Sequence, residues 1–145
     1  MIKINHALSL LAADHKKIRA MFLQYMALPD SQQAQKTKLL TAILRTLAVH
    51  VQLEEEILYP AIGSATDDPR LSEEGLLKFK ATKSLIQDIE DTDSDDPFYD
   101  QKMRIFATQF FARVEEEEGQ LFSHIRASNI DLIALGEDMA VFRDE

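Results

Sequence analysis

The sequence predicts an all-α protein, an up-down-up-down four-helix bundle with a short C-terminal helix. Apolar residues recur at alternating steps of three and four along four long segments, which is the spacing of one helix face. Glycine and proline number only 4 each in 145 residues, and the prolines and Gly63 fall near the ends of these segments. The connections between the segments are short, so consecutive helices are expected to pack antiparallel.

Breaks between the periodic segments set the expected helix boundaries. We expect one domain over residues 1–145, with helices at about 4–27, 31–62, 69–91 and 97–126 and a tail helix at about 131–142. Asp30 or Ser31 is expected to cap the second helix. Asp68 before Pro69, and Asp96 before a second proline, predict an N-cap followed by a proline at the first position of the third and fourth helices.

The composition excludes several classes of protein. The chain has no cysteine, so disulfides, thiolate metal ligands and thiol nucleophiles are absent. Its formal net charge of -9 and the lack of a dense basic cluster argue against a nucleic-acid partner. No apolar run approaches the roughly 20 residues of a membrane span, and the first residues lack the pattern of a signal peptide. We therefore expect a cytoplasmic protein with no membrane partner.

One apolar stripe on each long helix is expected to face the bundle axis. The stripe residues are Leu8, Leu11, His15, Ile18, Phe22 and Tyr25 in the first helix, Leu40, Ile43, Leu47, His50, Glu54 and Ile57 in the second, Leu76, Phe79, Thr82, Ile86 and Ile89 in the third, and Phe106, Phe110, Arg113, Glu117 and then Gln120 or Leu121 in the fourth. Five polar residues interrupt these stripes near the middle of their helices, and antiparallel packing can bring them into one layer. They are His15, His50, Glu54, Arg113 and Glu117.

The second and fourth helices carry similar motifs that differ at one position. Residues four apart lie on the same helix face, so His50 and Glu54 offer an imidazole beside a carboxylate, which is half of a metal site. Arg113 and Glu117 offer a guanidinium beside a carboxylate, and a guanidinium is never deprotonated to bind a metal. The sequence therefore indicates a twofold metal-binding pattern that has lost part of one half.

A buried polar layer requires compensation, because an unpaired buried carboxylate costs several kcal/mol or more. A metal ion, a salt bridge through Arg113, or water can each supply it. A divalent ion with two neutral imidazoles and two carboxylates is neutral, and Arg113 adds one positive charge. Two structural alternatives remain open at this point. His15 and His50 can be core histidines paired with the two glutamates, and Arg113 can extend outward to Glu116 or to solvent.

The chain resembles the hemerythrin-like HHE cation-binding family across nearly its whole length. The matching segments are Leu10–Phe22, His50–Pro60, Lys83–Ile86, Val114–Phe122 and the tail segment Leu135–Met139. The resemblance implies a bundle that holds two irons bridged by two carboxylates, here Glu54 and Glu117. It assigns His15 and His50 to one iron, whereas the histidine positions of the other iron fall on Phe79 and Arg113.

Both ligand losses thus affect the same metal, and this suggests a specific hypothesis. The Arg113 guanidinium replaces the charge of the second metal and bridges Glu54 and Glu117, while Phe79 fills the vacated volume. A single metal can remain at His15, His50 and the two glutamates. Reversible O2 carriage by a pair of irons is not expected from such a site.

Three functions follow from these alternatives. The first is a metal-binding module that holds one iron or another divalent cation and binds or senses a metal or a small diatomic ligand. The second is a metal-free structural or interaction domain in which Arg113 replaces the metal. The third is a non-heme iron oxidoreductase acting on O2, peroxide or nitric oxide. No residue is predicted to be catalytic, and the sequence identifies no protein partner.

Overall fold

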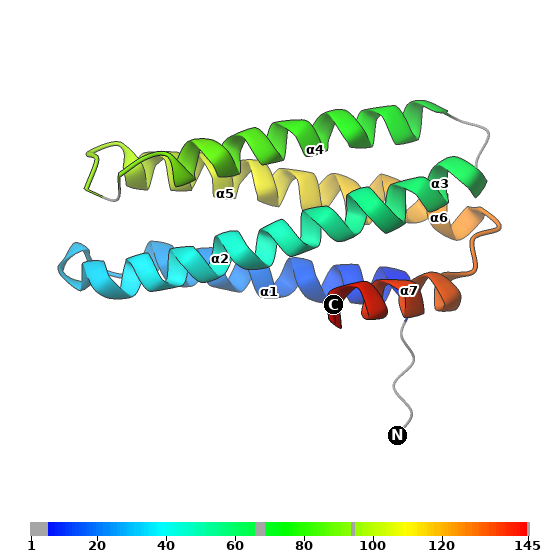
Figure 1. Ribbon diagram of the computed structural model, residues 1–145, viewed down its shortest axis with the longest axis horizontal. Helices are drawn as coiled ribbons and strands as arrows, with labels where there is room; N and C mark the ends of the chain where they lie inside the picture. Colours follow the sequence, from blue (N-terminus) through cyan, green and yellow to red (C-terminus); the bar gives the residue numbers. More distant parts are fainter. Residues whose placement is uncertain (1–5, 66–68, 94, 145) are drawn as a thin grey trace, which may run out of the picture.

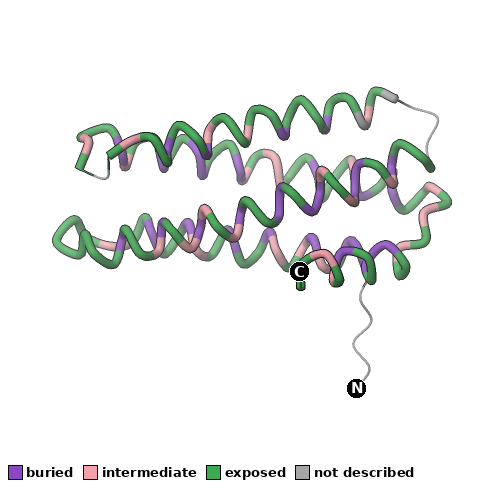
Figure 2. The backbone as a smooth tube through the Cα atoms, viewed as in Figure 1, coloured by how far each residue is buried: buried purple, intermediate pink, exposed green. Residues whose placement is uncertain are grey.

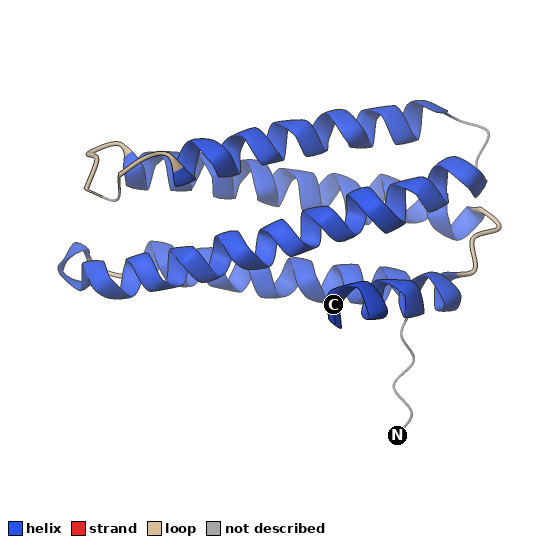
Figure 3. Cartoon of the chain, viewed as in Figure 1, coloured by secondary structure: helices blue, strands red, loops and turns tan. Residues whose placement is uncertain are grey.

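The chain folds into long helices, with no strand in the part that the structure describes (Figure 3). The computed structural model describes residues 6–65, 69–93 and 95–144. The α-helices are α1 (Ala7–Ala27), α2 (Gln33–Leu53), α3 (Tyr59–Ala65), α4 (Pro69–Glu90), α5 (Tyr99–Glu116), α6 (Phe122–Ala127) and α7 (Leu132–Asp144). No helix among these residues is long and apolar enough to cross a membrane.

The long helices α1, α2, α4 and α5 run alternately up and down, in the expected bundle order (Figure 1). Two five-residue π-helical turns, η2 (Glu54–Leu58) and η3 (Glu117–Leu121), join α2 to α3 and α5 to α6 without a break. The short helix α7 returns along the outside of the bundle and packs on α1 (Figure 1). The C-terminal segment therefore covers the helix that carries His15.

The turn between α1 and α2 differs from the expected cap. Asp30 and Ser31 belong to a short 3-10 turn, η1 (Asp30–Gln32), and α2 begins after it with no side-chain cap at Gln32. The Asp30 carboxylate instead accepts a hydrogen bond from the buried Lys36 ammonium at 3.0 Å. The prediction of an Asp30 or Ser31 cap is therefore wrong, because this carboxylate compensates a buried charge.

The helix α4 starts at the expected proline, whereas α5 starts later than expected. The helix α4 begins at Pro69, while its expected cap, Asp68, lies outside the described residues. The Asp96 carboxylate accepts a hydrogen bond from the Phe98 amide at 2.8 Å, and α5 begins at Tyr99 rather than at about residue 97. Asp96 thus closes the turn before the helix instead of capping its first turn.

Purple segments along the facing sides of the helices in Figure 2 mark one continuous core. Most predicted stripe residues are buried there, but Leu76 is 43% exposed. The inward position on this turn of α4 belongs to Gly75, whose backbone lies against the Tyr59 ring from α3. Because that ring fills the space where a side chain would point, α4 presents its glycine to the core and turns Leu76 outward.

The two π-helical turns shift the core register in both halves of the repeat. Each begins at a glutamate, and the amide five residues later donates to its carbonyl, as Tyr59 does to Glu54 and Phe122 does to Glu117. The extra residue per turn moves the following side chains around the helix axis. Leu58 is consequently fully buried in place of the predicted Ile57, and Phe122 is buried while Gln120 is exposed.

Candidate metal centre

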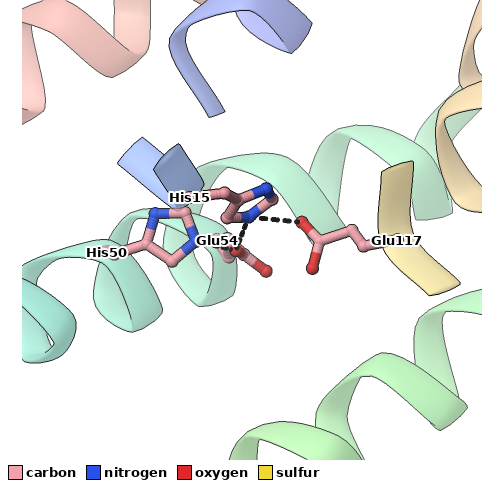
Figure 4. Close-up of side chains that lie close together, drawn as sticks. All are labelled: His15, His50, Glu54 and Glu117. Atoms are coloured by element: carbon pink, nitrogen blue, oxygen red, sulfur yellow. Dashed lines mark ion pairs between the residues drawn. The ribbon is translucent and has the colours of Figure 1, made fainter. Parts of the chain in front are cut away.

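Four side chains from different parts of the sequence meet in the bundle core and form what we call the His/Glu site (Figure 4). These residues are His15 on α1, His50 on α2, Glu54 at the start of η2 and Glu117 at the start of η3. Each offers one nitrogen or oxygen, and these four atoms lie within 4.8 Å of one another. All four side chains are buried, and they are four of the five residues expected in the polar layer; the fifth, Arg113, is partly exposed.

The two imidazoles direct their Nε2 atoms at the carboxylates. His15 Nε2 lies 3.9 Å from Glu54 Oε1 and 3.7 Å from Glu117 Oε1, the contacts dashed in Figure 4. His50 Nε2 contacts the same Oε1 atom of Glu54. Glu54 is four residues after His50, so the two side chains lie on one face of the helix. Glu54 is therefore the central residue of the cluster, since it contacts both histidines.

A second set of carboxylates holds the other nitrogen of each imidazole. Asp14 Oδ2 lies 3.1 Å from His50 Nδ1, and Glu118 Oε1 lies 3.3 Å from His15 Nδ1. Arg143 of α7 contacts the same Asp14 oxygen at 2.5 Å. A carboxylate on one ring nitrogen fixes the tautomer and leaves the other nitrogen free to bind a metal. Sequence reasoning missed these residues because helical spacing places Asp14 and Glu118 off the inward stripes.

Replacement of Asp14 by asparagine is expected to weaken metal binding by roughly 10–100-fold, as is typical when a residue that orients a metal-bound histidine is lost. The physical reason is that a neutral amide holds the Nδ1 proton of His50 less strongly than a carboxylate does. Competition with a chromophoric chelator measures the change. Glu137→Gln, on the exposed surface of α7, removes one negative charge elsewhere and serves as control. Equal affinities for the two variants would contradict the positioning role.

The buried charges shift the pKa values of the metal-free site in a consistent way. Burial disfavours the charged imidazolium of His50, but the attraction of Glu54 and the hydrogen bonds to Asp14 and Glu54 outweigh it and raise its pKa to about 10. Burial also works against ionisation of Glu54, yet the charge of His50 holds the pKa of that carboxyl below its usual range. Burial and the negative Glu54 raise the pKa of Glu117 well above the usual value. An incoming metal must therefore displace protons, and its affinity is expected to rise with pH.

Unsatisfied polar atoms test whether a cation fits this site. Glu54 Oε2 and Glu117 Oε1 are buried and have no hydrogen-bond partner among the described residues. Buried acceptors without donors are rare in folded proteins, and a cation satisfies them. Two imidazole nitrogens with two carboxylates suit iron, manganese or zinc. The residues present therefore fit a divalent metal.

Arg113 and Phe79 lie together beside the site, on the facing helices α5 and α4. The Arg113 guanidinium stacks over the Phe79 ring, with its carbon 4.7 Å from the ring centroid. Phe79 is 2% exposed and packs edge-on against Tyr59, so it fills core volume. Neither side chain offers a lone pair to a metal.

The expected bridge from Arg113 to both glutamates is present only on one side. Arg113 Nη2 lies 3.9 Å from Glu54 Oε2, but no ion pair or hydrogen bond joins Arg113 to Glu117 among the described residues. The reason is that Nη1 turns toward α4, where it donates to the Lys78 carbonyl at 3.0 Å and to the Thr82 hydroxyl. Within the described part of the chain no ion pair joins Arg113 to Glu116, whose carboxylate pairs with Lys78 at 2.9 Å.

A helical bundle with histidines and carboxylates in its core defines a class of candidate metal-binding proteins, and comparison identifies the family. The family model described as the hemerythrin HHE cation binding domain matches residues 6–125. The chain therefore belongs to the hemerythrin HHE cation binding family.

Two individual proteins are similar to this chain. The crystal structure of a hemerythrin HHE cation binding domain-containing protein from Mycobacterium kansasii has a TM-score of 0.79 and 24% sequence identity, covering 99% of this chain and 86% of that chain. That likeness shows the shared fold. A DNA nickase from a Nostoc species is 28% identical over 116 residues, which are 78% of this chain and 31% of the nickase. The chain thus spans about a third of the length of that relative.

Proposed function

We propose that this chain binds one iron or another divalent ion through the His/Glu site and acts in metal or small-ligand binding or sensing. The observation that carries the proposal is the pair of buried carboxylate oxygens, on Glu54 and Glu117, that have no hydrogen-bond partner among the described residues. Leaving two such groups uncompensated in a core costs several kcal/mol. A cation removes that cost, and the two neighbouring imidazoles complete a suitable donor set.

The chain's own residues prepare the site for such an ion. Asp14 and Glu118 orient the imidazoles, and the surrounding core limits the access of water to the carboxylates. When bound, the metal supplies positive charge and open positions for a small ligand such as a diatomic molecule. Phe79 and Arg113 occupy the two degenerate positions, which supports a stoichiometry of at most one ion per chain.

Elemental analysis tests the proposal directly. Protein produced with added iron and purified without chelator is expected to contain about one metal ion per chain. A folded protein that contains none after iron supplementation, and takes up none on titration with iron(II), manganese(II) or zinc(II), would falsify it. Circular dichroism on the same samples establishes that the fold is intact.

The double replacement Phe79→His with Arg113→His is expected to raise the metal content from about one to about two ions per chain. The two residues touch each other across α4 and α5, so both new imidazoles would lie beside the glutamates. Phe79→Leu with Arg113→Leu removes the same side chains without adding ligands and should remain at one ion. Unchanged stoichiometry in the histidine variant would show that these positions are not the lost ligand positions.

A second candidate function is a metal-free structural domain, and the contact of Arg113 with Glu54 is the observation that favours it. If Arg113 replaces the metal, Arg113→Ala should destabilise the protein by roughly 3–5 kcal/mol, as the loss of one partner from a buried ion pair does. If a bound metal ion is instead the main group that compensates the buried glutamates, the metal-loaded Arg113→Ala variant should lose only about 1–2 kcal/mol of unfolding free energy. That loss corresponds to the missing hydrogen bonds from Arg113 to α4. Urea unfolding with and without metal separates these outcomes.

We also propose that this chain does not bind nucleic acid, although one relative is a DNA nickase. The formal net charge of -9 supports this, because phosphate contacts need clustered lysine and arginine. Nicking is a property of that longer relative, and the region that resembles this chain is 31% of it. A mobility-shift titration with duplex and single-stranded DNA at low salt should show no complex, and a salt-dependent complex would refute the proposal.

A further inference from the structure

A cavity of about 260 Å³ lies next to the His/Glu site, between α2, α4 and α5. Its inner wall includes His15, His50, Glu54 and Glu117 themselves. The remaining wall is mainly apolar and includes Leu47, Val51, Leu85, Phe106 and Phe110. An apolar cavity of about 150 Å³ is large enough to hold benzene. This cavity therefore has room for an aromatic ring together with a polar head group.

The cavity opens to the surface on the side of α4 and α5. The outer lining residues, Lys78, Ala81, Gln109, Ala112 and Glu116, are all exposed. At this opening Lys78 and Glu116 form an ion pair at 2.9 Å, so their charges cancel. A molecule entering from solvent would therefore pass a neutral opening and reach the His/Glu site at the inner end.

The charge of the site, if it is loaded as proposed above, favours an anion. One divalent ion, two carboxylates and two neutral imidazoles sum to zero, and the adjacent Arg113 adds one positive charge. Asp14 and Arg143 compensate each other. Glu118 is 39% exposed and lies beyond His15, so water screens its charge. A net charge of +1 thus faces an apolar cavity, where a monoanion would neutralise it.

Polar groups around the inner cavity fit the same kind of ligand. Arg113 lines the cavity, and its Nη2 is a donor with no hydrogen-bond partner among the described residues. Gln109 on α5, nearer the opening, can also donate hydrogen bonds, whereas the Thr82 hydroxyl already donates to the Lys78 carbonyl at 3.0 Å. A guanidinium is well matched to a carboxylate, because its planar donors can bind both oxygens.

We propose that this cavity binds a small organic monoanion, a carboxylate with an apolar body, with its head beside Arg113 and its body against the apolar wall. The inference rests on the proposed metal binding, because a bound ion would add an open position that one carboxylate oxygen can occupy. It names the class of small ligand that the site accepts, which is larger than a diatomic molecule.

Benzoate and benzyl alcohol are suitable probes, because they share an aromatic ring and differ in charge. Protein loaded with zinc, which has no redox chemistry, is titrated with each probe by calorimetry after its zinc content has been measured. Benzoate is expected to bind at least tenfold more tightly than benzyl alcohol. Removal of zinc and the variant Arg113→Gln should each weaken benzoate binding at least tenfold.

A cavity-filling variant tests the location of the bound probe. Ala81→Phe places a ring at the opening and should reduce benzoate binding at least tenfold with zinc content unchanged. Ala20→Phe, on the exposed face of α1, is the matched control and should bind benzoate as the parent does. Three results would overturn the inference and leave metal binding intact. The first is one zinc per chain without benzoate binding, and the second is equal affinity for benzoate and benzyl alcohol. The third is benzoate binding that is unaltered in the metal-free protein or in Ala81→Phe. Absence of bound zinc and iron would instead overturn the proposed function.

Discussion

Glu54→Gln is expected to reduce the metal content from about one ion per chain to near zero. Glu54 contacts both imidazoles of the His/Glu site and carries one of the unsatisfied buried oxygens. The amide keeps the shape of the side chain but removes the negative charge that binds a cation. The expected loss of affinity is more than about 100-fold, because residues that merely orient a ligand already contribute roughly 10–100-fold.

The same variant has a second readout that does not require metal. Because Glu54 is the main group that stabilises the His50 imidazolium, the pKa of His50 should fall from about 10 in the metal-free parent. Titration of the histidine ring signals by NMR measures this change. Glu56→Gln, two residues later on the exposed side of η2, should alter neither the metal content nor this pKa. Full metal content in Glu54→Gln would mean that the ion binds elsewhere.

Gly75→Ala is expected to destabilise the protein by about 2 kcal/mol or more, despite the higher helix propensity of alanine. A Cβ atom at position 75 would lie 1.9 Å from Cε1 and 2.3 Å from Cδ1 of the Tyr59 ring. That ring is 4% exposed and packs edge-on on Phe79, so it cannot move away without disturbing the core. Overpacking of this kind typically costs about 1–3 kcal/mol, and the very short contact places the cost at the upper end.

The measurement is urea unfolding, and Gly119→Ala is the matched control. Gly119 also lies within a helical path, in η3, but nothing lies within 4 Å of the Cβ that would be added. Alanine there should therefore be neutral or stabilise the protein by up to about 1 kcal/mol, the usual difference in helix propensity. The same substitution should thus destabilise the protein at position 75 and not at position 119. Equal stability of both variants would contradict the packing of α4 on Tyr59.

Helical periodicity was a reliable guide to the core wherever the helix remains regular. His15, Ile18 and Phe22 are buried on α1 at the predicted spacing, as are Ile43 and Leu47 on α2. The prediction fails after Glu54 and after Glu117, because a π-helical turn inserts a residue that a period of 3.6 does not include. This is why the buried residue is Leu58 where Ile57 was expected.

The candidate site was predictable in its inner layer and not beyond it. The four residues of the His/Glu site stand on inward stripes, where polar side chains are costly and therefore conspicuous. The orienting residues Asp14 and Glu118 precede or follow a stripe residue by one position, where charged side chains are ordinary surface residues. Arg143 is 129 positions from Asp14, so only the docking of α7 on α1 reveals their contact.

The sequence by itself determined the helical bundle, the family resemblance and the side chains that gather in the buried layer. These depend on local spacing and on the cost of burying polar groups, and both can be read from neighbouring residues. Only the tertiary structure decided that Arg113 forms an ion pair with Glu54 and hydrogen bonds with α4, and that a cavity remains beside the His/Glu site. Those features depend on how closely the helices pack and on their rotation about their axes, which arise from the sum of many contacts across the bundle.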